Sequence, residues 1–142
     1  MKFYLYRTST RLLSTDGVLC DEHGSPICNT AEHTLHKLPE GTYQLSLQRH
    51  HRLGHRALLL QRHHRLGRRT LLLQRHHTPT AMAWIIHGNG VYGKAFGASI
   101  VVGEYLVPGV VVRSYPYFER LLKRIEKVIK RGSQVELIIQ SS

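Results

Sequence analysis

The sequence predicts one α+β domain over residues 1–142, made mainly of an antiparallel β sheet that curls into a small barrel or sandwich. One long amphipathic helix near the C-terminus and a final strand complete the expected fold. Three observations support this fold class. Short apolar or alternating runs recur between Gly, Pro and Asn turn signals, one stretch has apolar residues at helical spacing, and 142 residues suffice for a single core.

The first part of the chain has the pattern of successive strands. Residues 3–8 are aromatic and β-prone, and they predict the first strand. Asp16-Gly17 is a turn signal that leads into residues 18–20. The segment His23-Gly-Ser-Pro26 then turns the chain into residues 27–31, so that the two short runs form a hairpin.

The clearest strand of the first half follows the break at Leu38-Pro-Glu-Gly41. In residues 42–47 apolar and polar side chains alternate with period two, as in a strand with one buried face. The turn Leu106-Val-Pro-Gly109 separates two of the later runs. Further strands are expected at residues 81–86, 99–102, 110–112 and 135–139.

A helix is expected between Ser114 and Gly132. Ser114 suits the N-cap, Pro116 the first turn, and Gly132 the position just after the last turn. The expected buried face consists of Phe118, Leu121, Leu122, Ile125, Val128 and Ile129. The opposite face is basic and is interpreted as solvated.

A tandem repeat interrupts the alternating pattern. Gln48-Arg-His-His-Arg-Leu-Gly-His-Arg-Ala-Leu-Leu-Leu60 recurs almost unchanged as residues 61–73, and a third copy begins at Gln74. Near-identity indicates a young duplication, and the period of thirteen matches no common solenoid. Residues 48–77 are therefore interpreted as a basic insertion within the single domain, either as extra Leu-rich strands or as an expanded loop.

The charge of the chain favours anionic partners. The formal net charge is +11, and no acidic residue occurs between Glu40 and Glu104. Within the repeat, arginines suit phosphate or carboxylate, whereas the absence of aromatic residues there disfavours base stacking. The candidate binding residues are Arg49, Arg52, Arg62, Arg65 and Arg75, together with Asn89 of the glycine-rich loop.

Metal and cofactor chemistry is not expected. The His-His pairs of the repeat could bind a metal adventitiously, but adjacent histidines on a strand point to opposite faces, so no metal site and no cofactor are predicted. Cys20 and Cys28 could meet across the hairpin, although two reduced thiols are the simpler interpretation.

The stretch from Trp84 to Glu104 is the candidate functional site, because two apolar runs enclose a glycine-rich loop. His87 and Ser99 could form a nucleophilic pair if the two strands are neighbours. Glu32 or Glu104 would orient the histidine, and the amides of Gly97 and Ala98 would stabilise an oxyanion. The simpler interpretation is that His87, Asn89 and Ser99 only shape the loop, since no Gly-x-Ser-x-Gly motif is present.

Several ordered motifs resemble an uncharacterised domain family of bacteria and their phages, whose pattern includes I-P-x-G-x-Y, I-H-x-G-N and G-C-I-x-V-G. The matching segments are Ile27-Cys-Asn-Thr-Ala-Glu32, Leu38-Pro-Glu-Gly-Thr-Tyr43, Ile86-His-Gly-Asn89 and Ala98-Ser-Ile-Val-Val-Gly-Glu104. More distantly, the chain is similar to the L,D-transpeptidase catalytic domain, which uses a Ser-His-Gly-Cys motif. Here Ser99 replaces the cysteine and Gly97 replaces the base histidine, so the resemblance implies the scaffold more than the activity.

We therefore expect a non-catalytic, phage- or prophage-related module whose basic repeat binds an anionic partner such as the cell wall. The alternatives are a peptidoglycan-acting acyl-transfer enzyme or hydrolase that uses Ser99 and His87, and a nucleic-acid-binding protein. Self-association through the repeat stays open. Neither a signal peptide nor a transmembrane segment is recognisable, so synthesis in the cytoplasm is expected, with association to a virion or cell wall.

Overall fold

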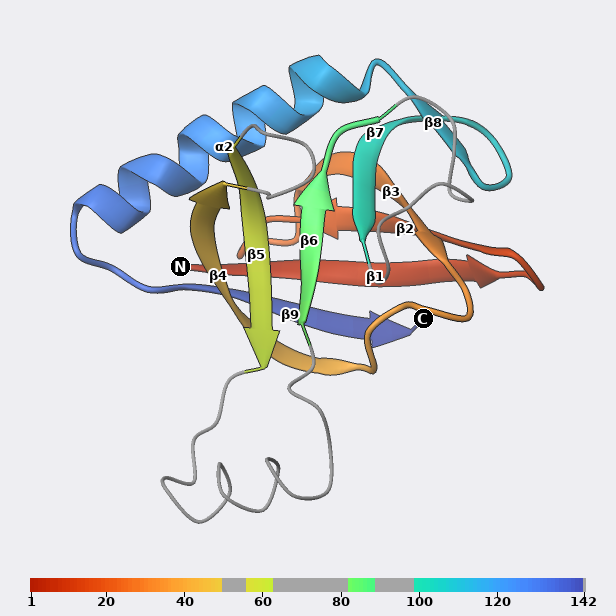
Figure 1. Cartoon of the computed structure of the whole chain (residues 1–142), viewed down its shortest axis with the longest axis horizontal. Helices are drawn as coiled ribbons and strands as arrows, with labels where there is room; N and C mark the ends of the chain where they lie inside the picture. Colours follow the sequence, from red (N-terminus) through yellow and green to blue (C-terminus); the bar gives the residue numbers. More distant parts are fainter. Residues whose placement is uncertain (50–55, 63–81, 89–98, 142) are drawn as a thin grey trace, which may run out of the picture.

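A computed structural model describes residues 1–49, 56–62, 82–88 and 99–141, and Figure 1 gives their arrangement. The described part is mostly β strand with one long helix. In chain order the elements are β1 (Lys2–Thr10), β2 (Ser14–Cys20), β3 (Pro26–His33), β4 (Gly41–Arg49), β5 (Arg56–Arg62), β6 (Met82–Ile86), β7 (Ile100–Val107), β8 (Val110–Val112), α2 (Ser114–Lys130) and β9 (Val135–Ser141).

The strands form one curled sheet in the order β3-β2-β1-β9-β4-β5-β6-β7-β8. Most neighbours are antiparallel, and the pairs β1–β9 and β6–β7 are parallel. Strand β3 also pairs with β7, which brings the two sides of the sheet together. The expectation of an α+β domain with a curled, mainly antiparallel sheet, a C-terminal helix and a last strand is confirmed (Figure 1).

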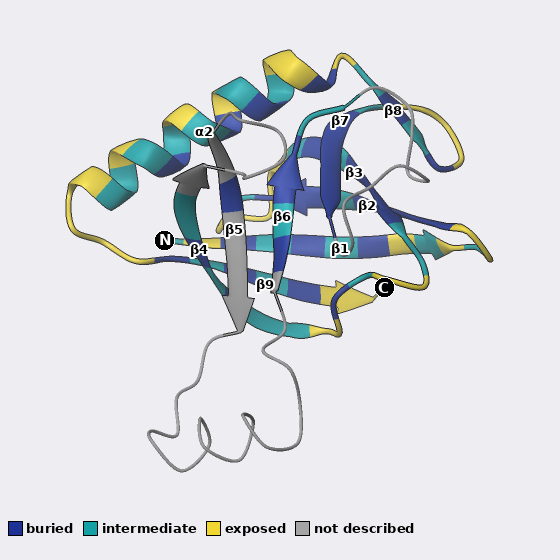
Figure 2. Cartoon of the chain, in the orientation of Figure 1, coloured by how far each residue is buried: buried dark blue, intermediate teal, exposed yellow. Residues whose placement is uncertain are grey.

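The core lies between the concave side of the sheet and α2. Alternate residues of the strands point inward, as the period of two predicts, and α2 adds residues at helical spacing. In Figure 2, α2 alternates between exposed and more buried residues, and β6 and the first half of β7 are mostly buried. The largest fully buried side chains include Phe3, Leu5, Tyr43, Leu58, Leu121, Ile125, Leu137 and Ile139.

The C-terminal end of α2 matches the sequence prediction. Gly132 has a φ of 82°, a left-handed conformation that glycine adopts without steric cost. Its N–H donates to the carbonyl of Ile129 at 2.9 Å, and the N–H of Ser133 donates to the carbonyl of Val128 at 3.2 Å. These two bonds form a Schellman motif, which satisfies carbonyls at the end of the helix.

The N-terminal end of α2 differs from the prediction. Arg113, with a φ of 52°, precedes the helix as its cap residue and makes no capping side-chain hydrogen bond. Ser114 is the first helical residue and is buried, so it is not the N-cap. The hydroxyl of Ser114 contacts β7 and the end of β6 instead, as described below.

The turn predicted at Asp16-Gly17 is wrong, because both residues lie inside β2. Gly17 is paired with Arg7 of β1 and with Thr30 of β3. A Cβ atom at residue 17 would lie 2.7 Å from the Oγ1 of Thr30, so glycine allows close packing here and not a reversal. The carboxylate of Asp16 binds Arg11 and accepts the N–H of Gly109 at 2.9 Å, which holds the β7–β8 turn against β2.

The repeat contributes a strand to the sheet. Strand β5 consists of the end of the first copy and the first two residues of the second, Gln61 and Arg62. It lies between β4 and β6 and places Leu58 in the core with none of its surface exposed. Of the two interpretations of the repeat, the Leu-rich strand therefore holds for residues 56–62. Residues 63–73 of the second copy lie outside the described residues.

Deleting residues 61–73 is expected to leave the protein folded. Residues 74 and 75 repeat Gln61 and Arg62, so the shortened chain restores the whole sequence of β5. Its connection to β6 falls from nineteen residues to six, which lowers the entropic cost of closure by about 1 kcal/mol. Thermal unfolding followed by circular dichroism should give an equal or slightly higher Tm.

The matched control deletes both copies, residues 48–73, and so removes β5. This variant should lose the cooperative transition. If the deletion of residues 61–73 lowers the Tm by tens of degrees, that result would contradict the structural account of the repeat.

Candidate functional site

The candidate site lies where β6 and β7 run side by side. The strands are parallel, with Ile85 opposite Ile100 and Ile86 opposite Val101. His87 follows β6 and, by extension of this register, lies level with Val102. Ser99 precedes β7, three residues before Val102, so the two backbones are offset by about 10 Å along the strands.

Ser99 and His87 also differ in their surroundings. Ser99 is 1% exposed, whereas His87 is partly exposed. The imidazole ring of His87 lies against the start of α2, with its centroid 5.2 Å from the ring of Tyr115 and 5.3 Å from that of Phe118. The sequence brings both residues to the ends of adjacent strands, and the structure places them in different environments.

Ser114 joins three elements at this site. Its hydroxyl donates to the carbonyl of Val102 in β7 and accepts the N–H of Gly88 at 3.0 Å. The side chain of Ser114 is buried, so its bond to Val102 is shielded from water, whereas its bond from Gly88 is partly buried. Gly103, the residue after Val102, permits the close approach of the segment before α2 to β7, because a Cβ atom at residue 103 would lie 2.7 Å from the carbonyl oxygen of Val112.

Sequence reasoning assigned Ser114 to a helix cap and missed this role. Gly88 follows β6, Val102 lies in β7 and Ser114 begins α2, and no spacing along the chain marks these residues as partners. The sequence therefore held no local signal for this role of the serine.

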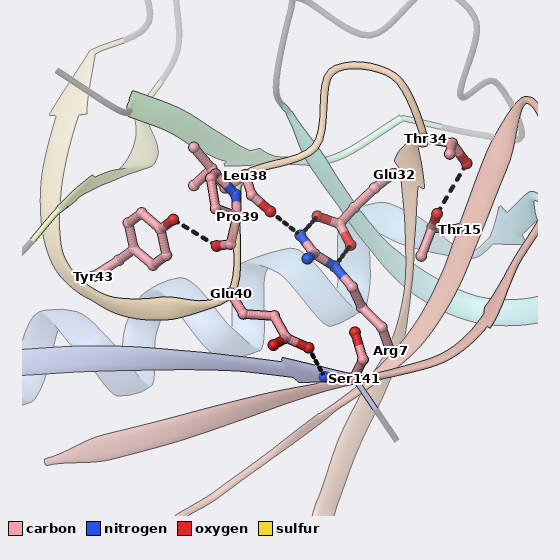
Figure 3. A network of polar contacts seen from close by, with 9 residues as sticks. All are labelled: Arg7, Thr15, Glu32, Thr34, Leu38, Pro39, Glu40, Tyr43 and Ser141. Atoms are coloured by element: carbon pink, nitrogen blue, oxygen red, sulfur yellow. Dashed lines mark hydrogen bonds and ion pairs between the residues drawn. The ribbon is translucent and has the colours of Figure 1, made fainter. Parts of the chain in front are cut away.

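The two carboxylates considered as orienting acids are placed differently. Glu32 is buried and accepts two hydrogen bonds from the guanidinium of Arg7, at 2.9 and 3.0 Å (Figure 3). Arg7 also donates to the carbonyl of Leu38 at 2.7 Å. Glu104 is half-buried and lies 3.8 Å from Arg113. Glu32 is therefore engaged in a structural ion pair that the sequence did not reveal.

The other predicted site residues are placed only in part. Arg49 and Arg62 occur at the ends of β4 and β5, where the backbone alone is described. Outside the described residues lie Asn89, Gly97, Ala98, Arg52, Arg65 and Arg75. Across residues 1–49, 56–62, 82–88 and 99–141, no group of three His, Cys, Asp or Glu side chains could hold a metal ion.

A pocket on the β3 side of the sheet was also missed. It measures about 180 Å³, and Cys28, Asn29, Gly103 and Tyr117 are among the residues that line it. The amide oxygen of Asn29 accepts the N–H of Tyr105 at 3.2 Å. Burial raises the pKa of the Cys28 thiol to about 12, so the pocket holds no thiolate nucleophile at neutral pH.

The comparisons with known proteins leave the resemblance as a prediction. No protein-family model, no curated protein and no solved structure matches the chain. The likeness to the bacterial and phage domain family, and to the L,D-transpeptidase domain, therefore depends on the motifs quoted above.

Replacing Ser114 with alanine should destabilise the fold by about 1–3 kcal/mol, since the partly buried N–H of Gly88 would lose its acceptor and the buried carbonyl of Val102 would lose a donor. Urea denaturation followed by circular dichroism measures the effect. Ser133→Ala, at an exposed serine after the same helix, is the control and should change stability by less than about 0.5 kcal/mol. Equal stability of the two variants would show that the serine does not link the three elements.

The cysteines should resist alkylation in the folded protein. Cys20 and Cys28 are buried free thiols, and burial raises the pKa of both above the usual value. Iodoacetamide at pH 8 should therefore modify the folded chain slowly and the urea-unfolded chain rapidly, with the Cys28 peptide as the slower of the two. Rapid labelling of folded Cys28 in the mass spectrum would contradict its described burial.

Proposed function

We propose that this chain is a non-catalytic, phage- or prophage-related module on a transpeptidase-like scaffold, and that its basic repeat binds an anionic partner such as the bacterial cell wall. The supporting observation is where the excess charge is located. Residues 41–103 contain nine lysines and arginines and no carboxylate. The remainder of the chain contains eleven lysines and arginines against nine carboxylates, so it is nearly neutral.

The carboxylates of that remainder are largely engaged with their own neighbours. Six of the nine are within 4.0 Å of a lysine or arginine that also lies outside residues 41–103. These pairs are Arg7–Glu32, Arg11–Asp16, Arg113–Glu104, Lys123–Glu119, Arg124–Asp21 and Lys130–Glu126. The chain therefore supplies little negative charge for the arginines of the repeat, and an external polyanion would supply it.

The topology divides the basic segment into two. Strand β5 is antiparallel to both β4 and β6, so residues 50–55 and residues 63–81 connect strands at opposite ends of β5. The insertion expected as a single arm is thus two basic connections with a core strand between them. The longer connection holds Arg65, Arg68, Arg69 and Arg75, which makes it the stronger candidate for the anionic partner.

Two observations weigh against the acyl-transfer alternative. A serine nucleophile needs a base within hydrogen-bond reach and access for its substrate. Ser99 is buried, and the strand register offsets it from His87. The nucleic-acid alternative has the same electrostatic basis as the proposal, so the binding experiment below includes it.

The expected location, synthesis in the cytoplasm followed by association with a virion or cell wall, stays part of the proposal. In the described part of the chain, no helix combines the length and the apolar composition needed to cross a bilayer. A cell wall or virion surface would then be reached through binding.

Replacing Arg65, Arg68, Arg69 and Arg75 together with glutamine should weaken binding to purified cell-wall sacculi by about fourfold or more, because an exposed charge pair typically contributes about 0.2–1 kcal/mol. Sedimentation with sacculi at salt concentrations from about 50 to about 300 mM, a range that changes the screening of charges, measures both the affinity and its salt dependence. The glutamine variant should show a shallower salt dependence.

The matched control removes four exposed positive charges outside the repeat by replacing Lys2, Arg120, Lys127 and Arg131 with glutamine. If the two variants lose affinity equally, net charge alone causes binding and the repeat has no special part. Duplex DNA and sacculi stripped of anionic wall polymers are tested in parallel. Tighter binding to DNA than to intact sacculi at the same salt concentration would favour the nucleic-acid alternative.

A further inference from the structure

Strand β5 occupies a position that two segments of this chain could fill. In the described arrangement β5 pairs with β4 from Arg49–Arg56 to Tyr43–Arg62, and with β6 through Leu58–Gln61. Leu58 is fully buried and belongs to the main core cluster. The position therefore requires a strand whose third residue, like Leu58, fits the core.

The second copy of the repeat has the required sequence. Residues 69–75 read Arg-Thr-Leu-Leu-Leu-Gln-Arg, and residues 56–62 read Arg-Ala-Leu-Leu-Leu-Gln-Arg. The two differ only at Ala57 and Thr70, and threonine favours a strand more than alanine does. Leu71 corresponds to Leu58, so the core residue is preserved.

The two arrangements have the same short and long connections to the neighbouring strands, but in the opposite order along the chain. With residues 56–62 as β5, six residues (50–55) join it to β4 and nineteen (63–81) join it to β6. With residues 69–75 in the same position, nineteen residues (50–68) would precede the strand and six (76–81) would follow it. Because the entropic cost of closing a loop depends on its length, the total cost is the same in both.

We propose that either copy of the repeat fills the β5 position, so that the folded chain exchanges between two arrangements of nearly equal stability. The exchange moves a nineteen-residue basic connection from the β5–β6 end of the sheet to the β4–β5 end. Residues 56–62 would leave the sheet as residues 69–75 enter it. The exchange depends on the repeat and on the sheet register, and it holds whether or not the basic segment binds the cell wall.

Disulfide trapping tests the exchange in the full chain. Ser46 is opposite Leu59 in the described register, and in the alternative it would be opposite Leu72. The pair Ser46→Cys with Leu59→Cys should form a disulfide, and Ser46→Cys with Leu72→Cys should form one to a similar extent. Cys20 and Cys28 are kept because they are buried, and peptide mapping identifies the bonds.

The control pair for trapping is Ser46→Cys with Leu73→Cys. Residue 73 would be opposite Leu45 in the alternative arrangement, and its side chain would point to the other face of the sheet. This pair should therefore react much more slowly. The proposal is overturned if only the 46–59 bond forms, if residues 72 and 73 react equally, or if the 46–72 bond occurs only between two chains.

A stability measurement gives an independent test. Leu58→Asp and Leu71→Asp should each lower the folding equilibrium constant only about twofold, since each removes one of two equally populated arrangements. The double variant should not fold, and neither should Leu58→Asp in the chain lacking residues 61–73. If Leu58→Asp alone unfolds the full chain while Leu71→Asp has no effect, the second copy does not replace the first.

Discussion

The buried ion pair between Arg7 and Glu32 is the constraint on which the arrangement of the N-terminal strands depends. It joins β1 to β3 across β2, and the same guanidinium holds the carbonyl of Leu38, so the connection to β4 is fixed as well. Removing either partner alone would leave a charge inside the protein, at a cost of about 3–5 kcal/mol. Figure 3 shows how further polar contacts extend this region, including Tyr43 to the carbonyl of Pro39 and Glu40 to the N–H of Ser141.

Local patterns in the sequence predict the elements well where burial alone determines them. Tyr43 and Leu45 alternate with polar residues, and the structure buries both in β4. The apolar spacing of α2 and the glycine after it likewise predict its buried face and its end. Asp16-Gly17 was misassigned because a glycine needed for close packing between strands has the same local sequence as a glycine needed for a turn.

The candidate site was harder to predict because its geometry depends on contacts between distant segments. His87 and Ser99 are near each other in the sequence, yet the parallel register of β6 and β7 separates them along the strands. Ser114 lies far from Gly88 in sequence and is hydrogen-bonded to it. The distribution of charge was easier to predict than the geometry of the site. The concentration of positive charge in residues 41–103 is visible in the sequence, whereas the division of that segment by β5 is visible only in the structure.

The position of β9 has a consequence for how the chain is made. Strand β9 lies between β1 and β4, and among the described strands it is synthesised last. While the ribosome is still translating the segment before Val135, the facing edges of β1 and β4 have no strand between them, and neither edge can be covered by its native neighbour. The sheet can therefore be completed only after β9 has left the ribosome, so until then chaperones are expected to cover the open edges of the nascent chain.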